Sequence, residues 1–228
     1  MLHTERTDGV LTVTLDDGKR NAITPAMCQA LIDVLDDAGD ASAIVLTGRD
    51  GTFSAGLDRD ALLGSGRASA ERLLVAFGHC LMRWWTDPRP TVAAATGHAL
   101  AGGTLLAMTC DQAIAAQDGA WGLVETQVGV ELPVFAITLA RHHLRTDRFE
   151  DLLLPGARID AATAVEVGFA DEVLPADQVL DRAVHRATEL AALPARAYAG
   201  TKRRLRQADA DAVLAGLDAD IDALLSSW

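Results

Sequence analysis

The sequence predicts an α/β fold with a helical C-terminal region, and three observations support this prediction. Short apolar or alternating segments rich in β-forming residues recur between residues 10 and 173. Segments with helical spacing of apolar residues lie between them, and glycine or proline marks most of the boundaries. From residue 176 onward, Ala, Leu, Arg and Asp recur at helical spacing. Alternating strands and helices are typical of an α/β architecture.

The expected elements follow one another in a regular order. Asp17 and Gly18 mark a turn after the first strand, and Thr24 followed by Pro25 is typical of a helix N-terminus. Pro88 ends the longest central helix, because the residue before a proline is biased away from helical geometry. The expected strands are residues 10–15, 43–47, 91–95, 112–116 and 170–173. The expected helices are residues 25–38, 69–85, 104–109, 132–143 and 161–167, followed by the helical tail from 176.

Two segments between these elements are rich in small residues and are expected to be loops. Residues 53–58 read Phe-Ser-Ala-Gly-Leu-Asp, and residues 97–103 read Gly-His-Ala-Leu-Ala-Gly-Gly. Small side chains leave backbone N–H groups uncovered, and a helix that begins on the second segment would favour a negatively charged oxygen there. Each segment alone is equally consistent with tight packing between a strand and a helix.

Charge and composition exclude several classes of function. A formal net charge of −12 disfavours nucleic-acid or anionic-membrane binding, because both require a basic face. Residues 91–110 lack Asp, Glu, Lys and Arg over the length of a bilayer span, but their Ala, Gly and Thr content predicts a buried strand, loop and helix. We find neither a Walker-type phosphate loop nor an H-E-x-x-H motif, and we expect no bound metal and no cofactor.

The cysteines and the first residues bear on the cellular compartment. Cys28, Cys80 and Cys110 are odd in number and far apart in apolar surroundings, so they suggest neither a disulfide framework nor a zinc site. The first six residues carry charges of both signs and no apolar core, unlike a secretory signal. We therefore expect the protein in the reducing cytoplasm.

Taken together, the two small-residue segments resemble the oxyanion-hole loops of the crotonase (enoyl-CoA hydratase/isomerase) family. The usual forms of these loops are F-S/A-A-G-A/L-D and G-x-A-x-G-G-G. The resemblance extends from Asp16 to about Lys202, and so it covers nearly the whole chain. Further segments match in the family's order at residues 21–22, 110–111, 121–129 and 161–171.

This resemblance implies a fold, an assembly and a substrate. The implied fold is the crotonase (ClpP-like) spiral of ββα units over residues 1–190. Residues 191–228 would form a helical region that builds a homotrimer or hexamer. The implied substrate is an acyl-CoA thioester that reacts through its enolate, so that CoA enters as part of the substrate.

Three residues are implied to carry the chemistry. The backbone N–H groups of Leu57 and Gly102 match the donors that bind the thioester oxygen as it becomes an oxyanion; one such donor is worth about 3 kcal/mol of barrier. Glu125 matches the family carboxylate that meets the α-carbon of the substrate, and we expect it to be the catalytic base. Its apolar neighbours predict a raised pKa. The alternative for Glu125 is a solvated loop glutamate.

The resemblance also implies where CoA binds. Ala22 and Ala55 match positions whose backbone holds the adenine and pantetheine portions, and Lys19 and Arg59 flank the same loops as candidate partners of the phosphates. The basic run 202–206 is either a solvated helix face or a further phosphate contact.

The sequence departs from the hydratases of the family at Leu105, where they carry a second glutamate that helps to position the added water. Val124 also replaces a proline, and Ala101 replaces the first glycine of the triplet. One carboxylate is sufficient to move a proton between two carbons of an enoyl thioester. We therefore expect a Δ3,Δ2-enoyl-CoA isomerase, with an enoyl-CoA hydratase of fatty-acid oxidation and a non-catalytic acyl-CoA binding protein as alternatives.

Other side chains offer weaker possibilities. A serine hydrolase would use Ser54 as nucleophile with His79 or His98 as base, but Ser54 does not lie in a G-x-S-x-G motif. Three further acids could replace the missing glutamate, although a solvated or capping role is favoured for each of them: Asp58, Asp60 and Glu131.

Overall fold

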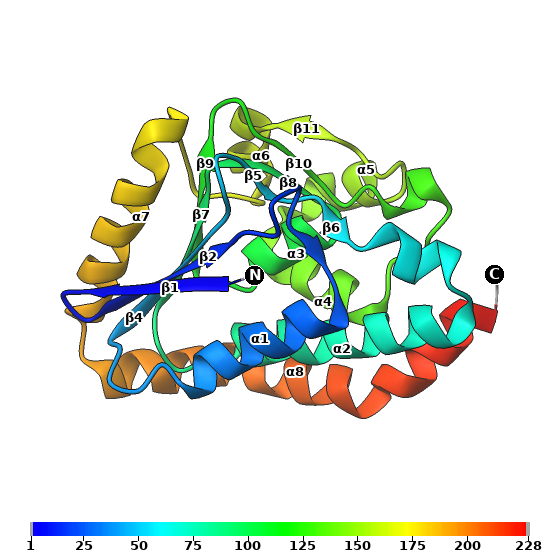
Figure 1. The fold of residues 1–228 in the computed structure, drawn as a ribbon, viewed down its shortest axis with the longest axis horizontal. Coiled ribbons are helices and arrows are strands. Elements are labelled where there is room, and N and C mark those ends of the chain that lie inside the picture. The colour runs from blue at the N-terminus through cyan, green and yellow to red at the C-terminus, as the bar shows by residue number, and fades with distance from the viewer. Residues whose placement is uncertain (1, 227–228) are drawn as a thin grey trace.

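Three β-sheets and the surrounding helices make up the structure, a computed structural model that describes residues 2–226. The largest sheet has six strands in the order β1-β2-β4-β7-β9-β12 (Figure 1). Its neighbouring strands are parallel, apart from the antiparallel pair β1 and β2. These strands are β1 (Leu2–Thr7), β2 (Val10–Leu15), β4 (Ala43–Thr47), β7 (Thr91–Ala95), β9 (Gln112–Ala116) and β12 (Glu172–Leu174).

The chain alternates between this sheet and a second sheet of four strands. β4 is followed by β5, β7 by β8, and β9 by β10, so each turn of the chain adds one strand to each sheet. This repeated strand–strand order, with helices closing the turns, winds the chain into a spiral and confirms the predicted α/β class. The second sheet contains β5 (Gly51–Ser54), β8 (Gly97–Leu100), β10 (Ala120–Gly122) and β11 (Ile159–Asp160), and a third pairs β3 (Ala22–Ile23) with β6 (Gly56–Leu57).

The helices cover both faces of the six-stranded sheet. α7 lies on one side of it, and α1, α2 and α8 run together along another side of the molecule (Figure 1). Short π-helical and 3₁₀ segments occur at Asp60–Gly64, Glu125–Val128 and Thr146–Arg148. The α-helices are α1 (Pro25–Asp36), α2 (Arg67–Trp85), α3 (Gly102–Met108), α4 (Val134–His143), α5 (Phe149–Leu153), α6 (Ala161–Val167), α7 (Ala176–Ala191) and α8 (Ala195–Ser226).

Burial on both faces explains why the central strands read as continuous apolar runs. In β4, Ala43 and Val45 pack in the core beneath α7, whereas Ile44 and Leu46 pack in the larger core. Parallel sheets that are covered on both sides have this pattern, because neither face meets water. The apolar segment at residues 91–110 accordingly forms β7, β8 and α3, and within residues 2–226 no helix has the length and apolar character needed to cross a membrane.

β1 is the longest of the strands that were not predicted. β1 has the largely polar sequence Leu-His-Thr-Glu-Arg-Thr and is mostly exposed, so it carries no apolar pattern. It is specified instead by its turn, because Asp8 and Gly9 both have positive φ angles of 50° and 81°. An Asp-Gly pair in this conformation matches the twist of a two-residue hairpin. The Asp-Gly pair was therefore the signal for this strand.

The structure also shifts several predicted boundaries. The two small-residue segments are partly strands, since β5, β6 and β8 lie within them, and α3 begins at Gly102 rather than at residue 104. The last predicted strand covers residues 172–174 instead of 170–173. The helical tail is divided into α7 and α8 near Pro194. Residues 1, 227 and 228, at the outer ends of the two predicted regions, lie outside the described residues.

A buried charge cluster attaches α8 to the central sheet. The Asp111 carboxylate, 9% exposed, lies 2.8 Å from Lys202 Nζ and 2.7 Å from Arg206 Nη1. The Tyr198 hydroxyl donates to the same carboxylate at 2.7 Å, and the Thr91 backbone N–H donates to it at 2.9 Å. Both carboxylate oxygens of Asp111 are therefore paired, which compensates for the loss of water.

We predict that Lys202→Met lowers the free energy of unfolding by about 3 kcal/mol, because it leaves Asp111 buried with less compensating charge. Denaturant unfolding measures the change. The matched control is Arg204→Met on the exposed face of the same helix, which is expected to stay within about 0.5 kcal/mol of the wild type. Equal losses in the two variants would contradict this role for the cluster.

Candidate active site

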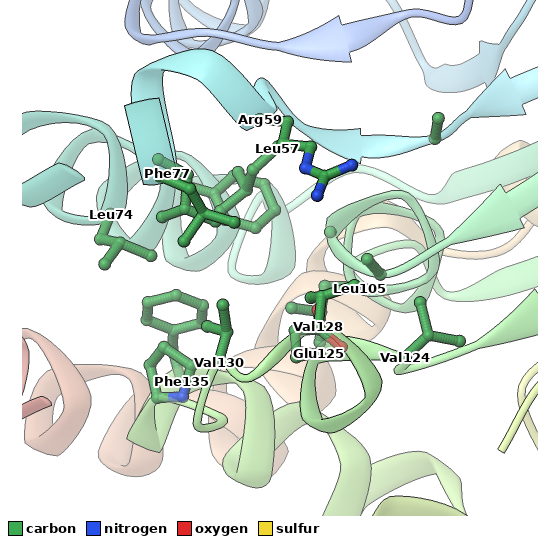
Figure 2. A pocket seen from close by; sticks show the side chains of 16 residues that line it. Leu57, Arg59, Leu74, Phe77, Leu105, Val124, Glu125, Val128, Val130 and Phe135 are labelled. Atoms are coloured by element: carbon green, nitrogen blue, oxygen red, sulfur yellow. The ribbon is translucent and has the colours of Figure 1, made fainter. Parts of the chain in front are cut away.

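One cavity of about 190 Å³ gathers residues from four separate parts of the chain. Leu57 comes from β6, Gly102 from the start of α3, and Glu125 from the 3₁₀ turn after β10. Ala55 and Arg59 also line it, next to Leu57. Thus five of the predicted site residues line one cavity, and Figure 2 shows the Glu125 carboxylate beside Leu105, with Leu57 and Arg59 on the opposite wall.

The two small-residue segments touch at this cavity. A Cβ added at Gly56 would lie only 2.9 Å from the Ala101 Cβ and 3.0 Å from the Gly102 backbone nitrogen. A Cβ added at Gly103 would overlap the Ser54 carbonyl oxygen. Only glycine at these positions permits the two segments to meet. This close approach places the backbone of Leu57 next to that of Gly102.

The backbone is strained where the second segment turns into α3. Ala101 has φ 50° and ψ −126°, a region that glycine favours and in which a side chain is unusual. Gly102, the first residue of α3, has no partner for its N–H group within the helix, because the first turn of a helix has no preceding carbonyls. Because Gly102 also lines the cavity, its N–H is a candidate donor to a ligand oxygen there.

A buried polar network holds the first segment in place. The Ser54 hydroxyl donates to the Asn21 carbonyl at 2.7 Å and accepts the Gly56 N–H at 3.1 Å. The Asn21 side-chain amide donates to the carbonyls of Leu15 and Phe53, both at 2.9 Å. These hydrogen bonds connect the first small-residue segment to β2 and to Asn21, the residue before β3. They thereby fix the position of the Leu57 backbone.

Glu125 is a desolvated acid. Its Oε2 atom is buried and has no hydrogen-bond partner among the described residues, and burial raises the pKa of the carboxyl to about 7. A carboxyl with this pKa is partly ionised at neutral pH, so it can both accept a proton and return it. The buried Oε2 atom and the raised pKa disfavour the alternative of a solvated loop glutamate.

Leu105 lies in the same cavity and is 2% exposed. It occupies the position at which the hydratases were expected to carry a second glutamate. Among the described residues that line the cavity, Glu125 is the single acid, and most of the others are aliphatic or aromatic. The cavity thus presents one carboxylate in apolar surroundings.

The remaining predicted ligand positions lie outside this cavity. Ala22 pairs with Gly56 across β3 and β6, so its backbone is close to the first segment. Lys19 is exposed on the preceding loop. Lys202 and Arg206 are held by Asp111, so those two residues of the run 202–206 are neither solvated nor free to reach a phosphate. Sequence spacing alone did not show this.

The structure does not support a serine hydrolase. Ser54 is fully buried and its hydroxyl is occupied by backbone groups. His98 Nδ1 accepts the Ala120 N–H at 3.0 Å, and His79 is exposed on α2. Neither histidine is placed to activate Ser54, so this interpretation is wrong.

The other acids do not replace the missing glutamate. Asp58 accepts the Ala61 N–H at 2.8 Å and caps the following turn. Asp60 and Glu131 are exposed and do not line the cavity. Within residues 2–226 we find no cluster of three or more His, Cys, Asp or Glu side chains suited to a metal ion.

Several residues of the cavity wall were not predicted from the sequence. Phe77 on α2, Phe135 on α4 and Val130 were recognisable as apolar positions, and all three line the cavity. Helical periodicity predicts a buried face, but it does not show which buried side chains border empty space. No local signal in the sequence distinguishes them.

Comparisons with known proteins agree on one family. A family model described as enoyl-CoA hydratase/isomerase matches residues 5–227. The structure of human mitochondrial delta3-delta2-enoyl-CoA isomerase superimposes with a TM-score of 0.94 at 28% identity, covering 99% of this chain and 90% of that one. An enoyl-CoA hydratase from Mycobacterium ulcerans superimposes with a TM-score of 0.92 at 31% identity, covering 97% and 98%. The predicted crotonase spiral is thereby confirmed.

A relative from Escherichia coli, 2,3-dehydroadipyl-CoA hydratase, is 29% identical over 93% of this chain and 84% of its own length. The matching proteins thus carry the names of both hydratases and isomerases. The similarity defines the family and leaves the choice of reaction to the residues of the cavity.

We predict that Glu125→Gln stabilises the protein at pH 8. The pKa of Glu125 is about 7 in the folded chain against an ordinary 4.5, so its ionisation destabilises the fold as pH rises through 7. The gain is at most about 3 kcal/mol, and partial solvent access reduces it. Thermal unfolding at pH 4 and pH 8 measures it.

The difference between the variant and the wild type should disappear near pH 4, where both side chains are neutral. Glu71→Gln, at an exposed position on α2, is the control and should leave the stability difference near zero at both pH values. A Glu125→Gln protein that is no more stable than the wild type at pH 8 would show that Glu125 is solvated.

Proposed function

The chain belongs to the enoyl-CoA hydratase/isomerase family, and from this premise we propose that it is a Δ3,Δ2-enoyl-CoA isomerase that uses Glu125 as its single acid–base group. One observation carries the proposal: the cavity holds the partly protonated Glu125 carboxyl, and Leu105 occupies the position of the second acid. An isomerase needs one group that accepts and returns a proton. A hydratase must in addition orient and activate water.

Substrate binding in this proposal depends on the backbone of the two small-residue segments. The thioester oxygen accepts hydrogen bonds from the N–H groups of Leu57 and Gly102. These donors stabilise the negative charge that the oxygen gains when the α-carbon loses a proton, and because the segments are rigidly packed, little reorganisation is needed. The donors therefore lower the barrier to enolate formation.

The proton moves in two steps. The Glu125 carboxylate removes a proton from C2 of the 3-enoyl thioester, and the electron pair of that C–H bond delocalises into a dienolate. The protonated Glu125 then delivers the proton to C4, and the remaining double bond lies between C2 and C3. The reaction is balanced and needs no metal or cofactor.

The CoA portion is proposed to lie along the first segment. The backbone of Ala22 and Ala55 would contact the adenine and pantetheine portions, and Lys19 and Arg59 would meet the phosphates. Support comes from Arg59 and Ala55, which line the cavity beside Leu57. The proposed assembly is a homotrimer or hexamer and the proposed compartment is the cytoplasm, both by family resemblance and composition.

The proposal is tested with wild-type, Glu125→Gln and Leu105→Glu proteins on 3-enoyl-CoA and 2-enoyl-CoA substrates, with double-bond migration and water addition followed separately. We expect migration to dominate in the wild type and to fall about 1,000-fold in Glu125→Gln, because general acid–base catalysis contributes this order of rate. Leu105→Glu supplies a second carboxylate, so water addition should increase.

Dominant hydration by the wild type would contradict the isomerase and would favour the hydratase alternative. If CoA thioesters bind but no double bond moves and no water adds, the protein is an acyl-CoA binding protein. Glu71→Gln serves as the control for a loss of charge away from the cavity.

A further inference from the structure

The part of the cavity beyond Glu125 has an entirely apolar wall. Figure 2 places Leu74, Phe77 and Phe135 on the side of the cavity away from Val124, with Val130 between Phe135 and Glu125. Phe77 and Phe135 are both buried, and their rings meet edge to face with centroids 5.8 Å apart at 89°. The two rings come from α2 and α4 and are in contact, so together they form one part of the cavity wall.

Both rings pack close to glycine residues. A Cβ added at Gly102 would lie 3.2 Å from the Phe77 ring, and a Cβ added at Gly78 would lie 3.2 Å from the Phe135 ring. Leu217 of α8 also packs against Gly78, since its Cδ1 would lie 2.7 Å from the same added atom. Both rings therefore lie in close packing, and the pair bounds the apolar end of the cavity.

The charged residues of the cavity lie outside this apolar part of the wall. Glu125 and Arg59 are the charged residues among the described side chains that line it, and Figure 2 places Arg59 on the wall opposite Phe135. A carboxylate at the far end of a bound acyl chain would lie among Leu74, Phe77 and Phe135 without a cation. Burying an unpaired charge is strongly unfavourable.

On the premise that the ligand is an acyl-CoA, as in the proposed function, we propose that the Phe77–Phe135 pair sets the maximum length of the acyl chain. The cavity accepts a chain that ends in a methyl group and rejects one that ends in a carboxylate. The substrate class is thus a monocarboxylic, aliphatic enoyl-CoA. The E. coli relative is named for a dicarboxylic substrate, so this chain would differ from it in specificity.

The test measures binding of saturated acyl-CoA esters by calorimetry, which requires no turnover. The probes are butanoyl-, hexanoyl-, octanoyl-, dodecanoyl- and hexadecanoyl-CoA, together with adipoyl-CoA as the carboxylate-terminated partner of hexanoyl-CoA. Affinity is expected to rise about four-fold per buried methylene until the chain reaches the aromatic pair, and then to stop rising. Adipoyl-CoA should bind at least about 30-fold more weakly than hexanoyl-CoA.

Two variants are expected to change the maximum length of the bound acyl chain in opposite directions. Phe135→Leu should shift the break in affinity to a longer chain, and Val130→Phe should shift it to a shorter one. Leu139→Val, a buried change on α4 away from the cavity, is the control and should leave the break unchanged. Because the two variants are measured separately, the proposal can still be tested if one of them fails to fold.

The specificity proposal would be overturned if affinity stopped rising at the same chain length in both cavity variants and the wild type. Equal affinities for adipoyl-CoA and hexanoyl-CoA would also overturn it. Either result would leave the proposed function intact. If the wild type binds none of the acyl-CoA esters, the proposed function itself fails, and the length limit fails with it.

Discussion

The close contact between two glycine-containing segments is the constraint on which the site depends. Gly56 lies against the Ala101–Gly102 peptide, and Gly103 lies against the Ser54 carbonyl, with no space for a side chain at either position. Each segment is anchored to a different turn of the spiral, through β5 and β6 on one side and through β8 and α3 on the other. The fold thereby brings together two backbone donors separated by more than forty residues of chain, and the strain at Ala101 is tolerated because packing on both sides holds it.

The carboxylates of Asp111 and Glu125 differ in their surroundings and in their roles. Asp111 is surrounded by Lys202, Arg206 and Tyr198, and it attaches α8 to the sheet. Glu125 is half-buried, but its Oε2 atom is buried without a hydrogen-bond partner, and desolvation raises its pKa to about 7. Pairing makes Asp111 a structural group, whereas the lack of pairing costs stability at Glu125 and gives it a pKa suited to proton transfer. The stability lost at Glu125 is thus linked to the proposed activity.

The sequence predicted the elements whose local signals agree with their environment. The strand at 43–47 and the helix closed by Gly168 appear where expected, because their apolar patterns match burial in the sheet and against it. β1 was missed because its stability comes from pairing and an Asp-Gly turn rather than from apolar periodicity. The catalytic candidates were found through motifs, but Phe77 and Phe135 were not, since only tertiary packing shows which buried rings border a cavity. The burial of Lys202 within a basic run is a further case in which only tertiary structure shows the role of a charged residue.

In the proposed isomerase, the Glu125 carboxyl alone carries a proton from C2 to C4 of the same substrate molecule. The most direct test is isomerisation of an unlabelled 3-enoyl-CoA in deuterium oxide, with deuterium at C4 of the product quantified by mass spectrometry at early conversion. Because Glu125 lies in an apolar cavity, we expect most product molecules to carry at C4 the protium that was removed from C2. Nearly complete deuterium incorporation at C4 from the first turnovers would contradict it, because the proton would then pass through solvent or through another acid.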